Sequence, residues 1–175
     1  MKKPFRTASS AHRIDPQWLS SAQAILCHRF SDQTLLTTAF THASFSGTSS
    51  SYERLEFLGD RVLGLILTDY LVRHFPQADQ GELTKRYHEL SNEAALAQVC
   101  QQLDLQRFAI HAPSQQGLTK RASVQSDIVE AVVAALYLDG GFEVARQFIL
   151  ANWTIPEELP TQSDTNPKSE LQEWA

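Results

Sequence analysis

Apolar residues recur at helical spacing along most of this chain, and no segment alternates with a period of two for long enough to predict a β-strand. Ser31, Asp32 and Ser91 can cap the helices that follow them, and Pro76 and Gly140 are typical of helix ends. Helices are therefore predicted over residues 16–30, 32–40, 53–75, 82–90, 92–103, 126–139 and 142–153. Polar loops are predicted over residues 46–51 and 111–122. The pattern predicts an all-α fold.

The helix predicted over residues 53–75 has apolar residues on more than one face, so we expect it to be the central buried helix. Gly59 and Gly64 lie in its interior, where each glycine costs about 1 kcal/mol relative to alanine. Close approach of another backbone is the expected compensation at both positions.

Composition agrees with a small intracellular protein. The chain has 175 residues, of which 42% are hydrophobic, enough for one domain with a core and an appendage. Cys27 and Cys100 lie in amphipathic segments and are interpreted as reduced core thiols. The basic start of the chain lacks the apolar run of a secretion signal, and no segment approaches the roughly 18 apolar residues of a membrane span. We therefore expect a soluble, cytoplasmic protein without a membrane partner.

Three acids share one stripe of the helix predicted over residues 53–75. Glu53, Glu56 and Asp60 are separated by three and then four positions, which places them on one face. Like charges so placed repel one another by roughly a few tenths of a kcal/mol per pair, and by more where water is excluded. A hard divalent cation such as Mg²⁺ or Mn²⁺ would neutralise them. A solvated polar face explains the same spacing.

A second pair of acids, Asp127 and Glu130, starts a segment that is otherwise nearly all apolar. Asp127 is also explained as a helix N-terminal cap. Glu130, one turn further along, needs a partner because burial of an unpaired carboxylate is costly. A metal ion shared between the two predicted helices would satisfy all of these acids together.

Two motifs resemble a known family. The sequence ERLEFLGD at residues 53–60 resembles the signature helix of ribonuclease III, and the residues after it up to Gly64 continue the likeness. The sequence DIVEA at residues 127–131, which runs on to YLDGG at residues 137–141, resembles the second acidic helix of that family. The helical segments between the two motifs also fit.

The resemblance implies a symmetric helical dimer that cleaves double-stranded RNA, of the type that processes ribosomal and messenger RNA precursors. In such an enzyme, water activated by Mg²⁺, for which Mn²⁺ can substitute, hydrolyses the phosphodiester and leaves 5′-phosphate and 3′-hydroxyl ends. By position, Glu56, Asp127 and Glu130 are expected metal ligands, and Asp60 and Glu130 are expected catalytic acids. Glu53 matches an auxiliary acidic position outside this quartet.

Other positions carry weaker expectations. Phe57 matches an apolar residue that inserts into the partner subunit of the family's dimer, with a role in its own core as the alternative. Family members carry an acid where this chain has Gln80, which argues against an acidic role there. The net charge of −5 is unusual for an RNA-binding protein, but basic pairs remain at residues 85–86 and 120–121. We interpret Lys85 and Arg86 as solvated surface and expect Lys120 and Arg121 to face phosphates.

The composition changes after residue 155. We predict a catalytic domain over residues 14–155, a polar linker over 156–166, and the truncated start of a double-stranded-RNA-binding domain over 167–175. Two alternatives from other classes remain. A helical nucleotide pyrophosphohydrolase also pairs acids on helices, but without the Phe-Leu-Gly insert at residues 57–59. A non-catalytic RNA-binding scaffold with this fold would be expected to lack one or more of the four acids, all of which are present.

Overall fold

The structure is a computed structural model that describes residues 15–46, 49–115 and 117–156. Its elements, in chain order, are α1 (Pro16–Ile25), α2 (Gln33–Phe40), α3 (Ala43–Ser46), α4 (Ser49–His74), α5 (Gln80–Ser91), α6 (Glu93–Gln102), the 3₁₀ turns η1 (Leu105–Phe108) and η2 (Leu118–Lys120), α7 (Ala122–Gly140) and α8 (Phe142–Asn152). Within these ranges the β-structure is one isolated parallel bridge between Thr41 and Ile110. The predicted all-α fold is confirmed.

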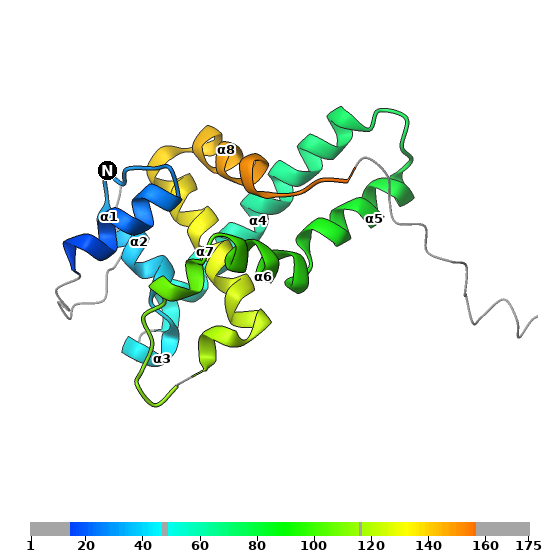
Figure 1. Ribbon diagram of the computed structural model, residues 1–175. Helices are drawn as coiled ribbons and strands as arrows, with labels where there is room; N and C mark the ends of the chain where they lie inside the picture. The colour runs from blue at the N-terminus through cyan, green and yellow to red at the C-terminus, as the bar shows by residue number, and fades with distance from the viewer. Residues whose placement is uncertain (1–14, 47–48, 116, 157–175) are drawn as a thin grey trace, which may run out of the picture.

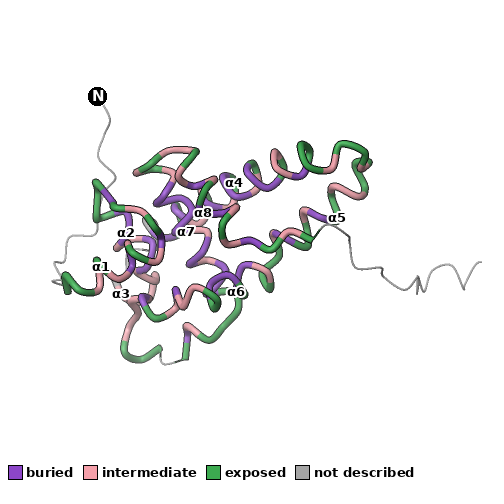
Figure 2. Tube along the Cα trace, turned by 45° about the horizontal axis from the view of Figure 1, so that its top comes forward, coloured by how far each residue is buried: buried purple, intermediate pink, exposed green. Residues whose placement is uncertain are grey.

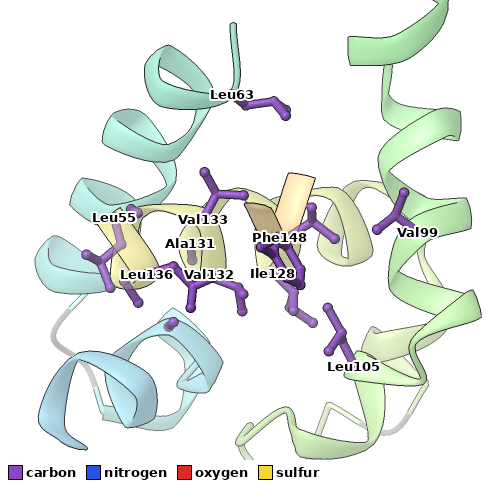
Figure 3. Packing of buried hydrophobic residues seen from close by; sticks show 14 of the residues in the cluster. Leu55, Leu63, Val99, Leu105, Ile128, Ala131, Val132, Val133, Leu136 and Phe148 are labelled. Carbon is purple, nitrogen blue, oxygen red and sulfur yellow. The ribbon is translucent and has the colours of Figure 1, made fainter. Parts of the chain in front are cut away.

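The centre of the bundle is α7, which packs against α2, α4, α6 and α8 (Figure 1). Its buried side chains include a continuous apolar run from Ala131 to Leu136. Figure 3 shows residues of this run between Leu55 and Leu63 of α4 on one side and Val99 and Leu105 on the other. The prediction that the helix at residues 53–75 would be central was wrong, because α4 buries one face against α7 and leaves the other open.

The close approach of α4 and α7 depends on Gly59. A Cβ added to Gly59 would lie 2.5 Å from the backbone carbonyl carbon of Glu130, and closer still to the carbonyl oxygen. The predicted backbone contact is thus present at this glycine. At Gly64 the prediction was wrong, since an added Cβ would instead meet the hydroxyl of the Tyr87 side chain at 3.0 Å.

Several helix boundaries differ from the predicted ones for local reasons. The first helix ends at Ile25, and Cys27 follows in a left-handed conformation (φ 49°) and is exposed, so it is not a core thiol. Asn92, not Ser91, caps the N-terminus of α6, because its side chain accepts a hydrogen bond from the Ala95 amide. The serines of the predicted first loop belong to α4 from Ser49 onward, whereas Gly47 lies outside the described residues.

The far half of α4 and α5 extend away from the rest of the bundle and lie beside each other (Figure 1), and most of α5 is exposed or half-buried (Figure 2). An apolar groove of about 300 Å³ lies between them, lined by Thr68, Leu71, Val72, Gln80, Leu83, Thr84 and Tyr87. Lys85 is exposed as predicted. Arg86 is not solvated surface, since its guanidinium is buried over the Phe75 ring and bonded to Glu82 and to the Pro156 carbonyl.

Asp139 joins the end of α7 to the segment between α1 and α2. Its carboxylate accepts hydrogen bonds from the Ser31 and Asp32 amides at 3.0 and 2.8 Å and from His28 Nε2 at 2.8 Å. Burial would raise the pKa of this carboxyl, but these donors outweigh it and leave the pKa below its usual value. This bonding fixes the C-terminal end of α7, whereas Gly59 fixes its middle.

Across the described ranges, no helix is both long enough and apolar enough to cross a membrane.

Candidate active site

Glu56, Asp127 and Glu130 form a carboxylate cluster, called here the acidic cluster. One carboxylate oxygen of each residue can be chosen so that the three lie within 4.8 Å of one another, and all three residues are half-buried. Glu56 comes from α4, while Asp127 and Glu130 lie three positions apart on the facing side of α7. The helices can bring these acids together because Gly59 lets α4 contact the Glu130 backbone.

Burial and mutual repulsion make the acidic cluster hard to ionise. Burial raises the pKa of Glu130 to about 7, with further contributions from Glu56 and Asp127 that outweigh the opposing charge of Arg61. The pKa of Glu56 is raised by burial and then by the charges of Asp127 and Glu53. Burial and the charge of Glu93 raise the pKa of Asp127. A bound cation would reverse these penalties, because it favours the charged form of every ligand.

The raised pKa of Glu130 predicts a pH-dependent stability of the metal-free protein. The pKa of the Glu130 carboxyl rises from its ordinary value of 4.5 to about 7 on folding. The contribution of Glu130 to the stability of the folded chain is therefore complete below pH 4.5 and is lost as the pH rises through 7. We expect the loss to be on the order of 2 kcal/mol, because partial solvent access screens the full effect. Urea unfolding in EDTA from pH 4.5 to 8 should show a flatter profile for Glu130→Gln than for the unsubstituted chain. Parallel profiles of stability against pH for the two chains would contradict the raised pKa of Glu130.

The other predicted acids lie apart from this cluster. Asp60, one turn after Glu56 on α4, is half-buried and forms an ion pair with the neighbouring Arg61. Glu53 is exposed and contributes its charge to Glu56. Asp127 lies in the second turn of α7, which begins at Ala122, so the interpretation of Asp127 as an N-terminal cap was wrong. Gln80 is exposed at the start of α5.

Tyr52 adds a feature that sequence patterns did not reveal. The residue lies one turn before Glu56, is 4% exposed, and has a buried hydroxyl with no hydrogen-bond partner among the described residues. Such an unpaired donor costs about 1–3 kcal/mol. Burial, followed by the charges of Asp127, Glu56 and Glu130, raises the pKa of this phenol, so the hydroxyl keeps its proton. The acidic cluster therefore has a neutral hydrogen-bond donor within its electrostatic reach.

The donor set fits a hard divalent cation. All three members of the acidic cluster offer carboxylate oxygens, and the described residues place no histidine or cysteine with them. The half-buried setting leaves room for water, which Mg²⁺ usually retains in protein sites.

The predicted phosphate-facing residues lie where α7 begins. Lys120 ends η2 and Arg121 precedes α7, and both side chains are exposed. The backbone just before them is held by the buried Gln125, whose side-chain N–H donates to the Thr119 carbonyl at 2.8 Å and whose side-chain oxygen accepts from Gln101 at 2.7 Å. A glutamine in an apolar helix gave no sequence signal for this role.

Comparison with known proteins decides the family. A family model described as Ribonuclease-III-like matches residues 32–156. The chain belongs to this family. Ribonuclease 3 of Rhodopseudomonas palustris is 48% identical over 157 residues, which cover 86% of this chain and 57% of the relative. Ribonuclease 3 of Azorhizobium caulinodans is 41% identical over 167 residues, which cover 92% of this chain and 71% of the relative. The family resemblance drawn from the two motifs is confirmed.

Solved structures agree with this assignment. The nuclease domain of ribonuclease III from Campylobacter jejuni, described for flexibility in a region involved in dimer formation, matches with a TM-score of 0.73 at 35% identity. The match covers 76% of this chain and 94% of that domain. Dicer from Pichia stipitis matches with a TM-score of 0.53 at 29% identity over 69% of this chain and 53% of Dicer. The chain spans 57% and 65% of the ribonuclease 3 proteins of R. palustris and Nitrobacter winogradskyi.

Proposed function

We propose that this ribonuclease-III-like chain is an endoribonuclease that hydrolyses double-stranded RNA with the help of a divalent cation. The observation that carries the proposal is the acidic cluster, in which carboxylates from α4 and α7 meet with raised pKa values. The names of the relatives and of the matched nuclease domain support the same activity. Processing of ribosomal and messenger RNA precursors in the cytoplasm is the setting that this activity suggests.

In this proposal Glu56, Asp127 and Glu130 hold the cation, with Mg²⁺ as the ion and Mn²⁺ as a substitute. When bound, the cation would stabilise charge on the scissile phosphate and activate water for attack, leaving 5′-phosphate and 3′-hydroxyl ends. Glu130, the most shifted of the three carboxyls, also serves as a catalytic acid. Asp60 is the second catalytic acid and orients water, and it lies beside Arg61, with which it forms an ion pair.

RNA binding is assigned to the edge of the site at which α7 begins. Lys120 and Arg121 are exposed there, six to ten residues before Asp127 and Glu130, and can neutralise phosphates. We place the catalytic domain at residues 14–155 and a linker at 156–166. The proposed start of a double-stranded-RNA-binding domain at residues 167–175 lies outside the described residues, as do the linker from residue 157 and residue 14.

The test of the function is incubation of the chain with a long RNA duplex, with Mg²⁺ and with EDTA, beside a single strand of the same sequence. We expect cleavage of the duplex only with Mg²⁺, and products whose 5′ ends a phosphatase can dephosphorylate. Binding without cleavage would favour the non-catalytic scaffold. Hydrolysis of nucleoside triphosphates with intact RNA would favour the pyrophosphohydrolase.

A two-fold symmetric homodimer is part of the proposal, because each acidic cluster serves one strand of a duplex. The face of α4 turned away from α7 exposes Phe57, Leu65 and Val72, which are 67%, 59% and 58% accessible. These positions recur at intervals of eight and seven residues and so share one helix face. An apolar stripe of this kind is typical of a protein–protein contact. The exposure of Phe57 is contrary to a role in the core of its own subunit.

Phe57→Ala is expected to weaken dimerisation with little effect on the fold of the subunit. Removal of a buried aromatic anchor at an interface costs about 2 kcal/mol or more, which corresponds to roughly a 30-fold weaker association. Sedimentation at several concentrations measures the change. Leu138→Ala is the matched control, since Leu138 is a 40% exposed apolar residue on α7. An unsubstituted chain that sediments as a monomer at micromolar concentration would contradict the dimer.

Cleavage by this chain is expected to fall steeply as salt rises, because few basic side chains contact the duplex and the net charge is −5. Substitution of Lys120 and Arg121 by glutamine should reduce the slope of log affinity against log salt by about 2, roughly one per phosphate contact. Lys85→Gln on α5 is the control and should leave the slope unchanged. A chain extended by a complete RNA-binding domain should bind more tightly at every salt concentration. Equal affinities and slopes for both chains would contradict this account.

A further inference from the structure

The hydroxyl of Tyr52 has a place in the structure that core packing does not explain. The Tyr52 side chain belongs to the hydrophobic core, where phenylalanine would fill the same space without bringing a buried polar group. Its hydroxyl is the buried side-chain group that lacks a hydrogen-bond partner among the described residues. Buried polar groups in proteins are nearly always hydrogen-bonded, and an exception calls for an explanation.

The Tyr52 hydroxyl lies within electrostatic reach of the acidic cluster. Tyr52 and Glu56 are four residues apart, so they lie one above the other on one face of the helix. The Tyr52 ring is packed beside His42, with ring centroids 5.9 Å apart, and α4, which carries Tyr52, packs against α7. All three members of the acidic cluster disfavour ionisation of the phenol, and Asp127 has the largest effect of the three.

The acidic cluster has carboxylate oxygens to spare when each residue ligates a cation through one oxygen. Three carboxylates provide six oxygens, and the three that lie within 4.8 Å of one another come one from each residue, which leaves three others. Ligating carboxylates need hydrogen bonds to their remaining oxygens, because these bonds fix their orientation. Within the described residues, no side chain donates a hydrogen bond to Glu56, Asp127 or Glu130.

We propose that Tyr52 is a positioning residue of the cation site, whose hydroxyl donates a hydrogen bond to an oxygen of the acidic cluster that the bound cation leaves free. This inference rests on the proposed function. Tyr52 stays neutral and does not ligate the ion. It orients a ligand, so the hydroxyl is unpaired in the metal-free chain and becomes paired when the site is loaded.

The test compares Tyr52→Phe with the unsubstituted chain by titration with Mn²⁺ alone, followed by electron paramagnetic resonance. We expect about tenfold weaker Mn²⁺ binding, the usual effect of losing a residue that holds a metal ligand in place. The Mn²⁺ concentration for half-maximal cleavage should rise by the same factor, with a much smaller change in the rate at saturating Mn²⁺. Melting without metal should stay equal or rise, because the substitution removes an unpaired polar group.

Tyr87→Phe is the matched control. It removes the same hydroxyl from α5, next to Gly64, which lies eight residues or about 12 Å along α4 from Glu56. Mn²⁺ affinity should not change in this variant. Unchanged Mn²⁺ affinity in Tyr52→Phe would overturn the proposal, as would a lower melting temperature of its metal-free form. If instead the unsubstituted chain binds Mn²⁺ no better than Glu130→Gln does, the cation site of the proposed function itself fails.

Discussion

Replacement of Glu130 by alanine is expected to abolish Mg²⁺-dependent cleavage of duplex RNA while the helices stay folded. The substitution removes one of three carboxylates that meet between α4 and α7, together with the group whose pKa of about 7 suits proton transfer near neutral pH. We expect the rate to fall by a factor on the order of 10³ or more, comparable to removal of a preorganised electrostatic group in other enzymes. The measurement is the initial rate at saturating Mg²⁺.

Stability separates this loss of chemistry from a loss of fold. Without metal, the melting temperature of Glu130→Ala should hold or rise at pH 7, because repulsion by Glu56 and Asp127 is relieved. Glu143→Ala is the control for loss of an acid, since Glu143 is exposed in the first turn of α8. Cleavage by Glu143→Ala should match that of the unsubstituted chain. Mg²⁺-dependent cleavage retained by Glu130→Ala would contradict the assignment of the active site.

Gly59→Ala is expected to destabilise the fold and to weaken the cation site together. Alanine improves helix propensity by about 1 kcal/mol, but its Cβ would overlap the backbone carbonyl of Glu130. Overpacking against side chains costs about 1–3 kcal/mol, and a backbone carbonyl cannot rotate away as a side chain can. We therefore expect a net loss of about 3 kcal/mol or more, measured by urea unfolding, and weaker Mn²⁺ binding at temperatures at which the chain remains folded.

Gly81→Ala is the matched control for a glycine in a helix. An added Cβ there would meet only the Asp79 carboxylate, at 3.2 Å, and Gly81 is exposed near the start of α5. Its stability should change by less than about 0.5 kcal/mol, as for most surface substitutions. Similar decreases in the free energy of unfolding for Gly59→Ala and Gly81→Ala would show that α4 and α7 can separate without cost.

The sequence allowed prediction of the helices and the family because both depend on local information. The spacing of apolar residues predicts the ends of most helices to within a few residues. The two acidic motifs are specific enough to indicate ribonuclease III. The choice of central helix was wrong because α4 and α7 are both apolar on several faces. Which face stays open depends on partners distant in sequence, and the exposed stripe through Phe57 and Leu65 has the composition of a core.

The candidate site, too, could be predicted from the sequence only in part. The spacing of acidic residues and the two motifs predict Glu56, Asp127 and Glu130 as members of one site. The spacing gave no indication of the ion pair between Asp60 and Arg61, because neighbours on a helix usually point apart and their rotamers decide the contact. Nor could it indicate Tyr52, whose interest lies in the lack of a hydrogen-bond partner among the described residues, a property of three-dimensional packing.

The hydrogen bonds of Asp139 limit how far the chain can be shortened from its N-terminus without loss of the fold. The region matched by the family model begins at residue 32, which excludes α1 and two of the three donors to Asp139, His28 and the Ser31 amide. A chain shortened to that region would leave the Asp139 carboxylate, whose side chain is 3% exposed in the whole structure, with only the Asp32 amide of its three donors. It would also lose Trp18, whose ring contacts Phe40 and Phe108 edge-on. The minimal autonomous unit therefore begins before Pro16, and a library of N-terminal deletions would lose soluble expression abruptly once the deletions pass Pro16 and enter α1.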